Sequence, residues 1–179
     1  MKVLFVYTGN ICRSPVAERM LAANSDNMGL NLVVQSAGTR AMNGHDMHPE
    51  SQRTLIESGT DASGFRSRLL TPSIVAECDL VLGMTREHRA VSRQHAPAQW
   101  KRMFALRELS EIYRRETSTE NYYPTLDPMS PNLDIADPIG RRSTVFDLVA
   151  VDIETCIVQV ARWINDNRSA VGVSALNQR

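Results

Sequence analysis

Residues 2–15 read KVLFVYTGNICRSP, and this stretch decides the fold. Its first half, Lys2–Tyr7, is a short run of β-branched and aromatic residues, which predicts a buried strand. Its second half passes through a Gly9-Asn10 turn to Ser14-Pro15. That pair is typical of a helix start, with Ser14 as the N-cap and proline at the first helical position. The stretch therefore predicts a strand, a tight turn and a helix.

Strands and helices alternate along the rest of the chain. We expect further strands at residues 32–35, 78–84 and 103–106. We expect helices at residues 49–58, from Thr71-Pro72 onward, and at residues 85–94 and 143–164, and mostly loop in the proline-containing region 110–140. This alternation predicts an α/β fold with a parallel sheet covered on both faces. In such a sheet the ligand binds beyond the carboxyl ends of the strands.

Composition favours one globular domain with no global attraction to polyanions. The chain has 179 residues, of which 42% are hydrophobic and 22% charged. We expect a domain over residues 1–165 and a polar, flexible tail over residues 166–179. Lys plus Arg and Asp plus Glu balance at 20 each, which argues against nucleic acid or a membrane as partner. Any anion site must therefore be local.

Cysteine usage indicates a reducing compartment. Cys12, Cys78 and Cys156 are odd in number and widely spaced, unlike a disulfide framework or a zinc site. No run of ~18 apolar residues occurs, and the N-terminus does not resemble a signal peptide. We therefore expect a cytoplasmic protein with no metal and no cofactor.

The turn after the first strand has the features of an anion site. A turn between a strand and a helix N-terminus can direct backbone N–H groups and the positive end of the helix dipole at an anion. Gly9 permits a tight path, Asn10 tolerates left-handed geometry, and Arg13 can fork two donors onto one oxyanion. On these residues alone, a plain strand-to-helix connection with a surface arginine is an equal alternative.

The wider sequence resembles the low-molecular-weight protein tyrosine phosphatase family. In that family the segment matching residues 6–15 is Val-Cys-x-Gly-Asn-Ile-Cys-Arg-Ser-Pro, and here it is VYTGNICRSP. The resemblance continues in family order through residues 36–39 (SAGT), 65–68 (FRSR), 78–89 (CDLVLGMTREHR) and 136–140 (ADPIG). It covers roughly residues 1–165 and implies a four-stranded parallel sheet of order 2-1-3-4 with helices on both faces.

The resemblance also implies roles for particular residues. Asn10 would hold the turn in shape by bonding Ser36, and Ser14 would stabilise charge on the residue at the strand end. Asp137 matches the general acid, and we prefer it to Asp127, which precedes the closing helix by too much. A phosphorylated or other anionic ligand would be held by the Arg13 guanidinium and by the backbone of Thr8, Gly9, Asn10, Ile11, Cys12 and Arg13.

Tyr7 departs from the family pattern, because the family has its nucleophilic cysteine at this position. A thiol at a helix N-terminus can reach a pKa well below neutrality, whereas a phenol starts near ~10. The larger side chain cannot place its oxygen at the floor of the loop. We therefore expect the ring to fill the site or swing out of it, and cysteine-based phosphatase turnover to be lost.

Three functional hypotheses follow. The leading one is a phosphatase-like protein that retains an anion-binding cleft for binding or regulation. The second is an enzyme repurposed for a different, biosynthetic reaction on a small molecule in the same cleft. The third is an active phosphomonoesterase that uses Cys12 or Tyr7 as nucleophile. A relay of cysteines like that of the related arsenate reductases would need Cys78 or Cys156, which we expect to lie in the core.

Other side chains have plainer interpretations that we prefer. Met42 falls near an aromatic that flanks the substrate in the family, but a surface methionine is the simpler prediction. His45 and His48 are expected to be solvated, and Tyr122-Tyr123 to be a packed pair rather than phosphorylation sites. Arg66, Arg68 and Arg107 could form a positive rim, or could be surface charges that flank helices.

Overall fold

The sheet has the predicted topology. The structure is a computed structural model, and it describes residues 1–119 and 125–167. Four parallel strands lie in the order β2-β1-β3-β4, which confirms the expected sheet. Their bounds are Lys2–Tyr7 for β1, Val33–Gly38 for β2, Leu80–Gly83 for β3 and Met103–Ala105 for β4.

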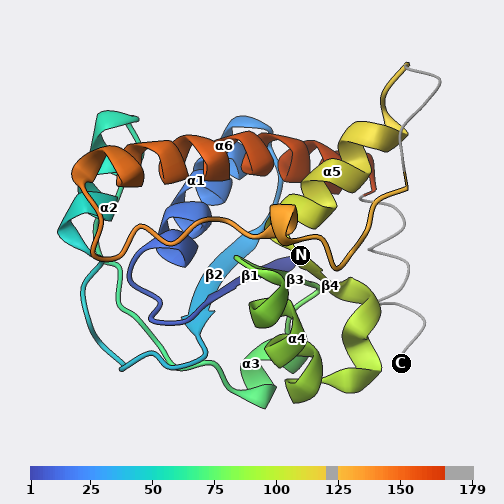
Figure 1. The fold of residues 1–179 in the computed structure, drawn as a ribbon, viewed down its shortest axis with the longest axis horizontal. Helices are drawn as coiled ribbons and strands as arrows, with labels where there is room; N and C mark the ends of the chain where they lie inside the picture. The colour runs from blue at the N-terminus through green and yellow to red at the C-terminus, as the bar shows by residue number, and fades with distance from the viewer. Residues whose placement is uncertain (120–124, 168–179) are drawn as a thin grey trace.

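Helices cover both faces of this sheet. On one face lie α1, α2, α5 and α6, and on the other lie α3 and α4 (Figure 1). The α-helices span Arg13–Asn27 (α1), Pro49–Glu57 (α2), Pro72–Ala76 (α3), Arg86–His95 (α4), Leu106–Glu116 (α5) and Ser143–Asp166 (α6). Two 3₁₀ helices, η1 and η2, span Pro97–Arg102 and Pro131–Leu133.

Strand β1 is buried on both sides and directs alternate residues to the two helical layers. Val3, Phe5 and Tyr7 join the hydrophobic cluster that includes residues of α1 and α6. Leu4 and Val6 join the other cluster, beneath α3 and α4. This alternation follows from the two-residue period of a strand. It places the Tyr7 side chain on the α1 side, at the carboxyl end of the central strand.

The prediction of mostly loop over residues 110–140 is wrong in its first part, where α5 continues to Glu116. The prolines of this region lie at position 124 and beyond, so they do not oppose a helix over residues 106–116. Leu106, Leu109 and Tyr113 recur at helical spacing and are buried. The Glu108 side chain accepts from the Ala105 backbone N–H at 2.8 Å and so caps the first turn.

The predicted N-cap of the first helix is also wrong. Helix α1 begins at Arg13 with Cys12 as N-cap, and no side chain caps it. Ser14 instead lies inside the first turn, where its Oγ accepts from Asn10 Nδ2 at 3.0 Å. This contact with Asn10, four residues earlier, therefore takes the place of the N-cap bond that the Ser-Pro pair predicts.

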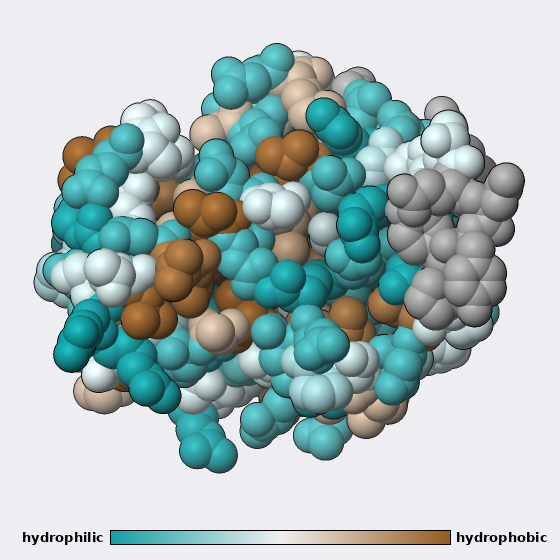
Figure 2. Space-filling model, turned by 45° about the horizontal axis from the view of Figure 1, so that its top comes forward, coloured by the Kyte–Doolittle hydropathy of each residue, from teal (hydrophilic) through white to brown (hydrophobic). Residues whose placement is uncertain are grey.

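The surface shows a few small hydrophobic patches in a largely hydrophilic face (Figure 2). Over the described residues, no helix is long and apolar enough to cross a membrane. All three cysteines are free and buried. Residues 168–179 of the predicted tail (166–179) and the Tyr122-Tyr123 pair lie outside the described residues, whereas Asp166 is the last residue of α6.

Candidate functional site

The turn after β1 leaves its backbone donors free of internal acceptors. Residues 8–12 form bends rather than helix, and Asn10 has a φ of 53°. Among the described residues, no acceptor is recorded for the N–H groups of residues 8–12. These groups lie where α1 begins, so they and the helix dipole are available to an anion. We call residues 8–13 the anion loop.

Gly38 brings the anion loop close to β2. A Cβ at Gly38 would lie 2.5 Å from the Thr8 carbonyl oxygen and 2.9 Å from the Asn10 nitrogen. Only a residue without a side chain tolerates this backbone contact. The adjacent N–H groups of Thr39 and Arg40 donate to the carbonyls of Tyr7 and Thr8 at 2.8 and 2.9 Å, which ties the loop to β2.

Asn10 holds the anion loop from inside. Its Nδ2 donates to Ser36 Oγ at 2.8 Å and to Ser14 Oγ at 3.0 Å. Its Oδ1 accepts from the Arg68 backbone N–H at 2.9 Å. The side chain is fully buried, and these hydrogen bonds offset the free-energy cost of burying its polar atoms. They also fix the left-handed backbone at this position.

Tyr7 fills the space between the anion loop and Asp137. Its hydroxyl lies 2.9 and 2.8 Å from the two carboxylate oxygens of Asp137, to which it donates. The Arg13 guanidinium carbon lies 4.1 Å from the centre of the Tyr7 ring. The tyrosine is only 2% exposed, so the ring does not swing out of the site. Of the two predicted placements, the structure shows the filled one.

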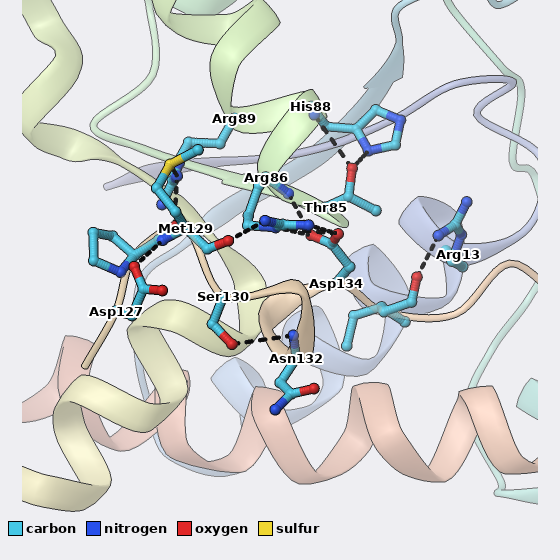
Figure 3. A network of polar contacts seen from close by, with 12 residues as sticks. Arg13, Thr85, Arg86, His88, Arg89, Asp127, Met129, Ser130, Asn132 and Asp134 are labelled. Atoms are coloured by element: carbon cyan, nitrogen blue, oxygen red, sulfur yellow. Dashed lines mark hydrogen bonds and ion pairs between the residues drawn. The ribbon is translucent and has the colours of Figure 1, made fainter. Parts of the chain in front are cut away.

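Arg13 is also bound within the protein. Its Nη2 donates to Asp137 Oδ2 at 2.7 Å. Its Nη1 donates to the Ile135 carbonyl at 2.5 Å, the contact drawn from Arg13 in Figure 3. Its side chain is 4% exposed, whereas that of Asp137 is 47% exposed. The carboxylate therefore lies between the phenol and the guanidinium and faces water on its other side. The contacts of Asp137 therefore engage both the Tyr7 hydroxyl and the Arg13 guanidinium.

Burial keeps the two candidate nucleophiles protonated. Burial, the largest cause, raises the pKa of Tyr7 to about 12, and the bond to Asp137 contributes to the rise. Burial also raises the pKa of Cys12 to about 11. Cys12 is fully buried, and its thiol lies against Ser51 of α2. Neither group supplies an anionic nucleophile near neutral pH.

The sequence interpretation missed His88, which contacts Thr8 of the anion loop. Figure 3 shows its contact with Thr85. Its Nε2 lies 2.9 Å from Thr8 Oγ1, and its Nδ1 lies 2.6 Å from Thr85 Oγ1. Its ring centre is 5.5 Å from that of Tyr7. Burial, assisted by the positive charge of Arg13, lowers the pKa of His88 to about 4. The imidazole is therefore neutral at pH 7.

Two sequence features position His88. Thr85 is the N-cap of α4, and its hydroxyl accepts from the His88 backbone N–H. A Cβ at Gly83 would lie 2.6 Å from the Arg89 nitrogen, so glycine is needed for α4 to lie this close to β3. The Thr85-x-x-His88 spacing at a helix start is the signal that could have indicated this histidine.

Three other predicted residues, Ser14, Met42 and Asp127, differ in their contacts and exposure. The recorded partner of Ser14 Oγ is Asn10 rather than Tyr7. Met42 is 70% exposed on the loop after β2. Asp127 accepts from the Met129 backbone N–H, whereas Asp137 accepts from Arg13 and Tyr7.

The remaining cysteines, histidines and arginines lie elsewhere. Cys78 and Cys156 belong to the two hydrophobic clusters. His48 is not simply solvated, because it caps α2 and stacks on Phe146 at 4.8 Å. Arg107 pairs with Asp152 of α6. Arg66 and Arg68 line a separate cavity, described below. Among the described residues, no cluster of His, Cys, Asp or Glu could hold a metal ion.

This fold and this loop define a family. The family model for low molecular weight phosphotyrosine protein phosphatase matches residues 2–170. The chain therefore belongs to the low molecular weight phosphotyrosine protein phosphatase family. The protein-arginine-phosphatase of Bacillus subtilis is 28% identical over 94% of this chain and 99% of its own length. The low molecular weight protein-tyrosine-phosphatase Etp of Escherichia coli is 30% identical over 72% of this chain and 88% of its own length.

Solved structures agree with this assignment. A mutant of the arginine phosphatase YwlE with a phosphorylated active-site serine is similar with a TM-score of 0.76 and 26% identity, covering 94% of this chain and 99% of that chain. A low molecular weight protein tyrosine phosphatase from T. tengcongensis is similar with a TM-score of 0.74 and 28% identity, covering 90% of this chain and 98% of that chain.

Proposed function

We propose that this protein is a phosphatase-family member that lacks cysteine-based turnover and binds a phosphorylated or other anionic ligand at the anion loop. One observation carries the proposal. The Tyr7 hydroxyl donates to Asp137 while the Tyr7 ring packs under Arg13. Tyr7 thus contacts Asp137 and Arg13, the two groups that would assist phosphoryl transfer, and it has no thiolate with which to attack phosphorus.

The anion-binding half of the proposal rests on the backbone. The N–H groups of residues 8–12 have no recorded acceptor within the described chain, and they lie at the start of the 15-residue helix α1. Unpaired N–H groups at a helix N-terminus favour phosphate and similar anions. The related YwlE mutant carries a phosphorylated serine in its own active site, which agrees with an oxyanion at this part of the fold.

An active phosphomonoesterase is disfavoured by the state of both candidate nucleophiles. Cys12 is buried with a pKa of about 11, beside α2 rather than at the mouth of the site. Tyr7 has a pKa of about 12, and its hydroxyl donates a hydrogen bond to Asp137. With the acid already bonded to the nucleophile, neither group is poised for attack on phosphorus followed by protonation of a leaving group.

A titration tests the binding half of the proposal. Inorganic phosphate, added to ¹⁵N-labelled protein at constant ionic strength, is expected to shift the amide resonances of residues 8–12 saturably. Sodium chloride at equal ionic strength serves as the control and is expected to leave them unchanged. Amides of residues 8–12 that respond to neither salt would contradict binding at the anion loop.

A further inference from the structure

A cavity lined by three arginines lies outside the anion loop. The cavity has a volume of about 310 Å³, within the range of small-molecule sites. It opens beside α1 and β2, which pack together (Figure 1). Its lining residues are Glu18, Arg19, Gln35, Ser36, Gly64, Phe65, Arg66 and Arg68. We call it the arginine cavity.

Three guanidinium groups meet at this cavity, and the chain fixes two of them. Arg68 donates from Nε to the Ser36 carbonyl at 2.7 Å and from Nη2 to Gln35 Oε1 at 2.8 Å. Arg19 donates from Nη2 to the Ser63 carbonyl at 2.8 Å. For both, no partner of Nη1 is recorded within the described residues. Each therefore retains donors for a ligand while the rest of its side chain is held in place.

The third arginine, Arg66, is the accessible one. Its side chain is 62% exposed and pairs with Asp46, which is itself 79% exposed. An ion pair this exposed contributes little to stability, so an anionic ligand can replace Asp46 as the partner of Arg66. Arg66 therefore adds a positive charge at the entrance of the cavity.

One carboxylate, Glu18, opposes these charges from within. It accepts a hydrogen bond from Ser36 Oγ at 2.6 Å, and its side chain is 16% exposed. Burial raises the pKa of Glu18, which weakens its negative charge at mildly acid pH. The lining set thus has three cationic side chains and one carboxylate, so it favours an anion.

We propose that the arginine cavity binds a phosphate group, either as the free ion or as a phosphomonoester, through Arg19, Arg66 and Arg68. Guanidinium groups suit phosphate because their planar donors match its oxygens in pairs. This site is distinct from the anion loop and does not depend on the role of Tyr7. A ligand in it would nevertheless lie next to Ser36, whose Oγ accepts from Asn10.

The proposal is tested by phosphate titrations followed at the amides of residues 18–19 and 64–66. The amide of Arg68 is left out because it donates to Asn10 of the anion loop. The double variant Arg19→Gln/Arg66→Gln removes two of the three cations but leaves Arg68, which supports β2. We expect it to weaken phosphate binding about tenfold or more. Arg114→Gln/Arg162→Gln, which removes the same charge from exposed positions elsewhere, is the matched control and should change affinity less than about twofold.

Two further arms make the test independent of folding defects. Glu18→Gln removes the opposing charge and should tighten phosphate binding, a gain that a damaged fold would not give. Phosphoserine used in place of inorganic phosphate separates the two sources: tighter binding supports a phosphomonoester, and equal binding supports the phosphate group alone. The proposal is overturned if the wild type shows no saturable shift at residues 64–66 by about 10 mM phosphate, or if the control weakens binding as much as the double variant does.

Discussion

The Tyr7 hydroxyl lies within 2.9 Å of both carboxylate oxygens of Asp137, a residue 130 positions later in the chain. This contact joins the residue that departs from the family pattern to the residue that matches the family's general acid. Because Arg13 binds the same carboxylate, the three side chains form one closed polar cluster. The predictions below concern this cluster and the elements that hold it.

Removal of the hydroxyl tests the contribution of the contact to stability. Tyr7→Phe should lower the free energy of unfolding by about 1 kcal/mol, measured by urea denaturation. A hydrogen bond to a charged group contributes ~1.5–3 kcal/mol when buried, and less here because water reaches Asp137. Tyr113→Phe is the matched control, since Tyr113 also donates to a carboxylate, Asp166, at 2.6 Å. Both carboxylates are exposed, but burial is the main cause of the raised pKa of Tyr7, whereas the bond to Asp166 is the main cause for Tyr113. The Tyr113 hydroxyl is therefore the less buried of the two and its loss should cost less, and an equal or greater loss in the control would contradict the account.

His88 should make stability depend on pH. Its pKa is about 4 in the folded protein and about 6.5 when unfolded, so the unfolded state binds more protons between these values. Stability should therefore fall as the pH drops from 6.5 toward 4, by up to roughly 3 kcal/mol from this group. His88→Gln should flatten the dependence in urea denaturation at several pH values. His45→Gln, at an exposed position, should not, and a parallel response of the two variants would refute the assignment.

Thiol labelling distinguishes a buried cysteine from a nucleophile. Cys12 is fully buried with a pKa of about 11, so the native protein should react with iodoacetamide at pH 8 far more slowly than a free thiol does. Tyr7→Cys places a thiol at the start of a helix, where the dipole lowers its pKa, and that variant should be labelled faster. Fast labelling of Cys12 in the wild type, located by peptide mapping, would revive it as a candidate nucleophile.

Gly38 should be intolerant of a side chain. Gly38→Ala would place a Cβ 2.5 Å from the Thr8 carbonyl oxygen, and overpacking of this kind costs ~1–3 kcal/mol. At Gly9 the nearest atom to a new Cβ lies 3.6 Å away, so Gly9→Ala is the control and should cost less. Thermal or urea unfolding of the two variants makes the comparison. Equal stability of Gly38→Ala and the wild type would show that the loop does not need this close approach.

The sequence predicts most of the framework but not all of the site. The strand, turn and helix of residues 2–15 follow from local patterns, and the resemblance implies the strand order. Helix α5 is missed because the prolines beyond residue 123 dominate the composition of region 110–140. His88 and the Ile135 carbonyl are missed because they reach the site by tertiary packing alone. The size of the Tyr7 side chain allows the ring either to fill the site or to swing out of it. Only packing in the folded protein selects the first.

The central claim is that the rest of the phosphatase site is present and that Tyr7 alone withholds the nucleophile. The most direct measurement is the rate of phosphate release from an aryl phosphate by the wild type, by Tyr7→Cys, and by Tyr7→Cys/Asp137→Asn, with folding checked by circular dichroism. We expect negligible turnover by the wild type, measurable turnover by Tyr7→Cys, and a loss of ~100–10,000-fold in the double variant because its general acid is removed. A wild-type kcat in the ordinary enzyme range of ~1–1000 per second, or a folded but inert Tyr7→Cys variant, would contradict this account.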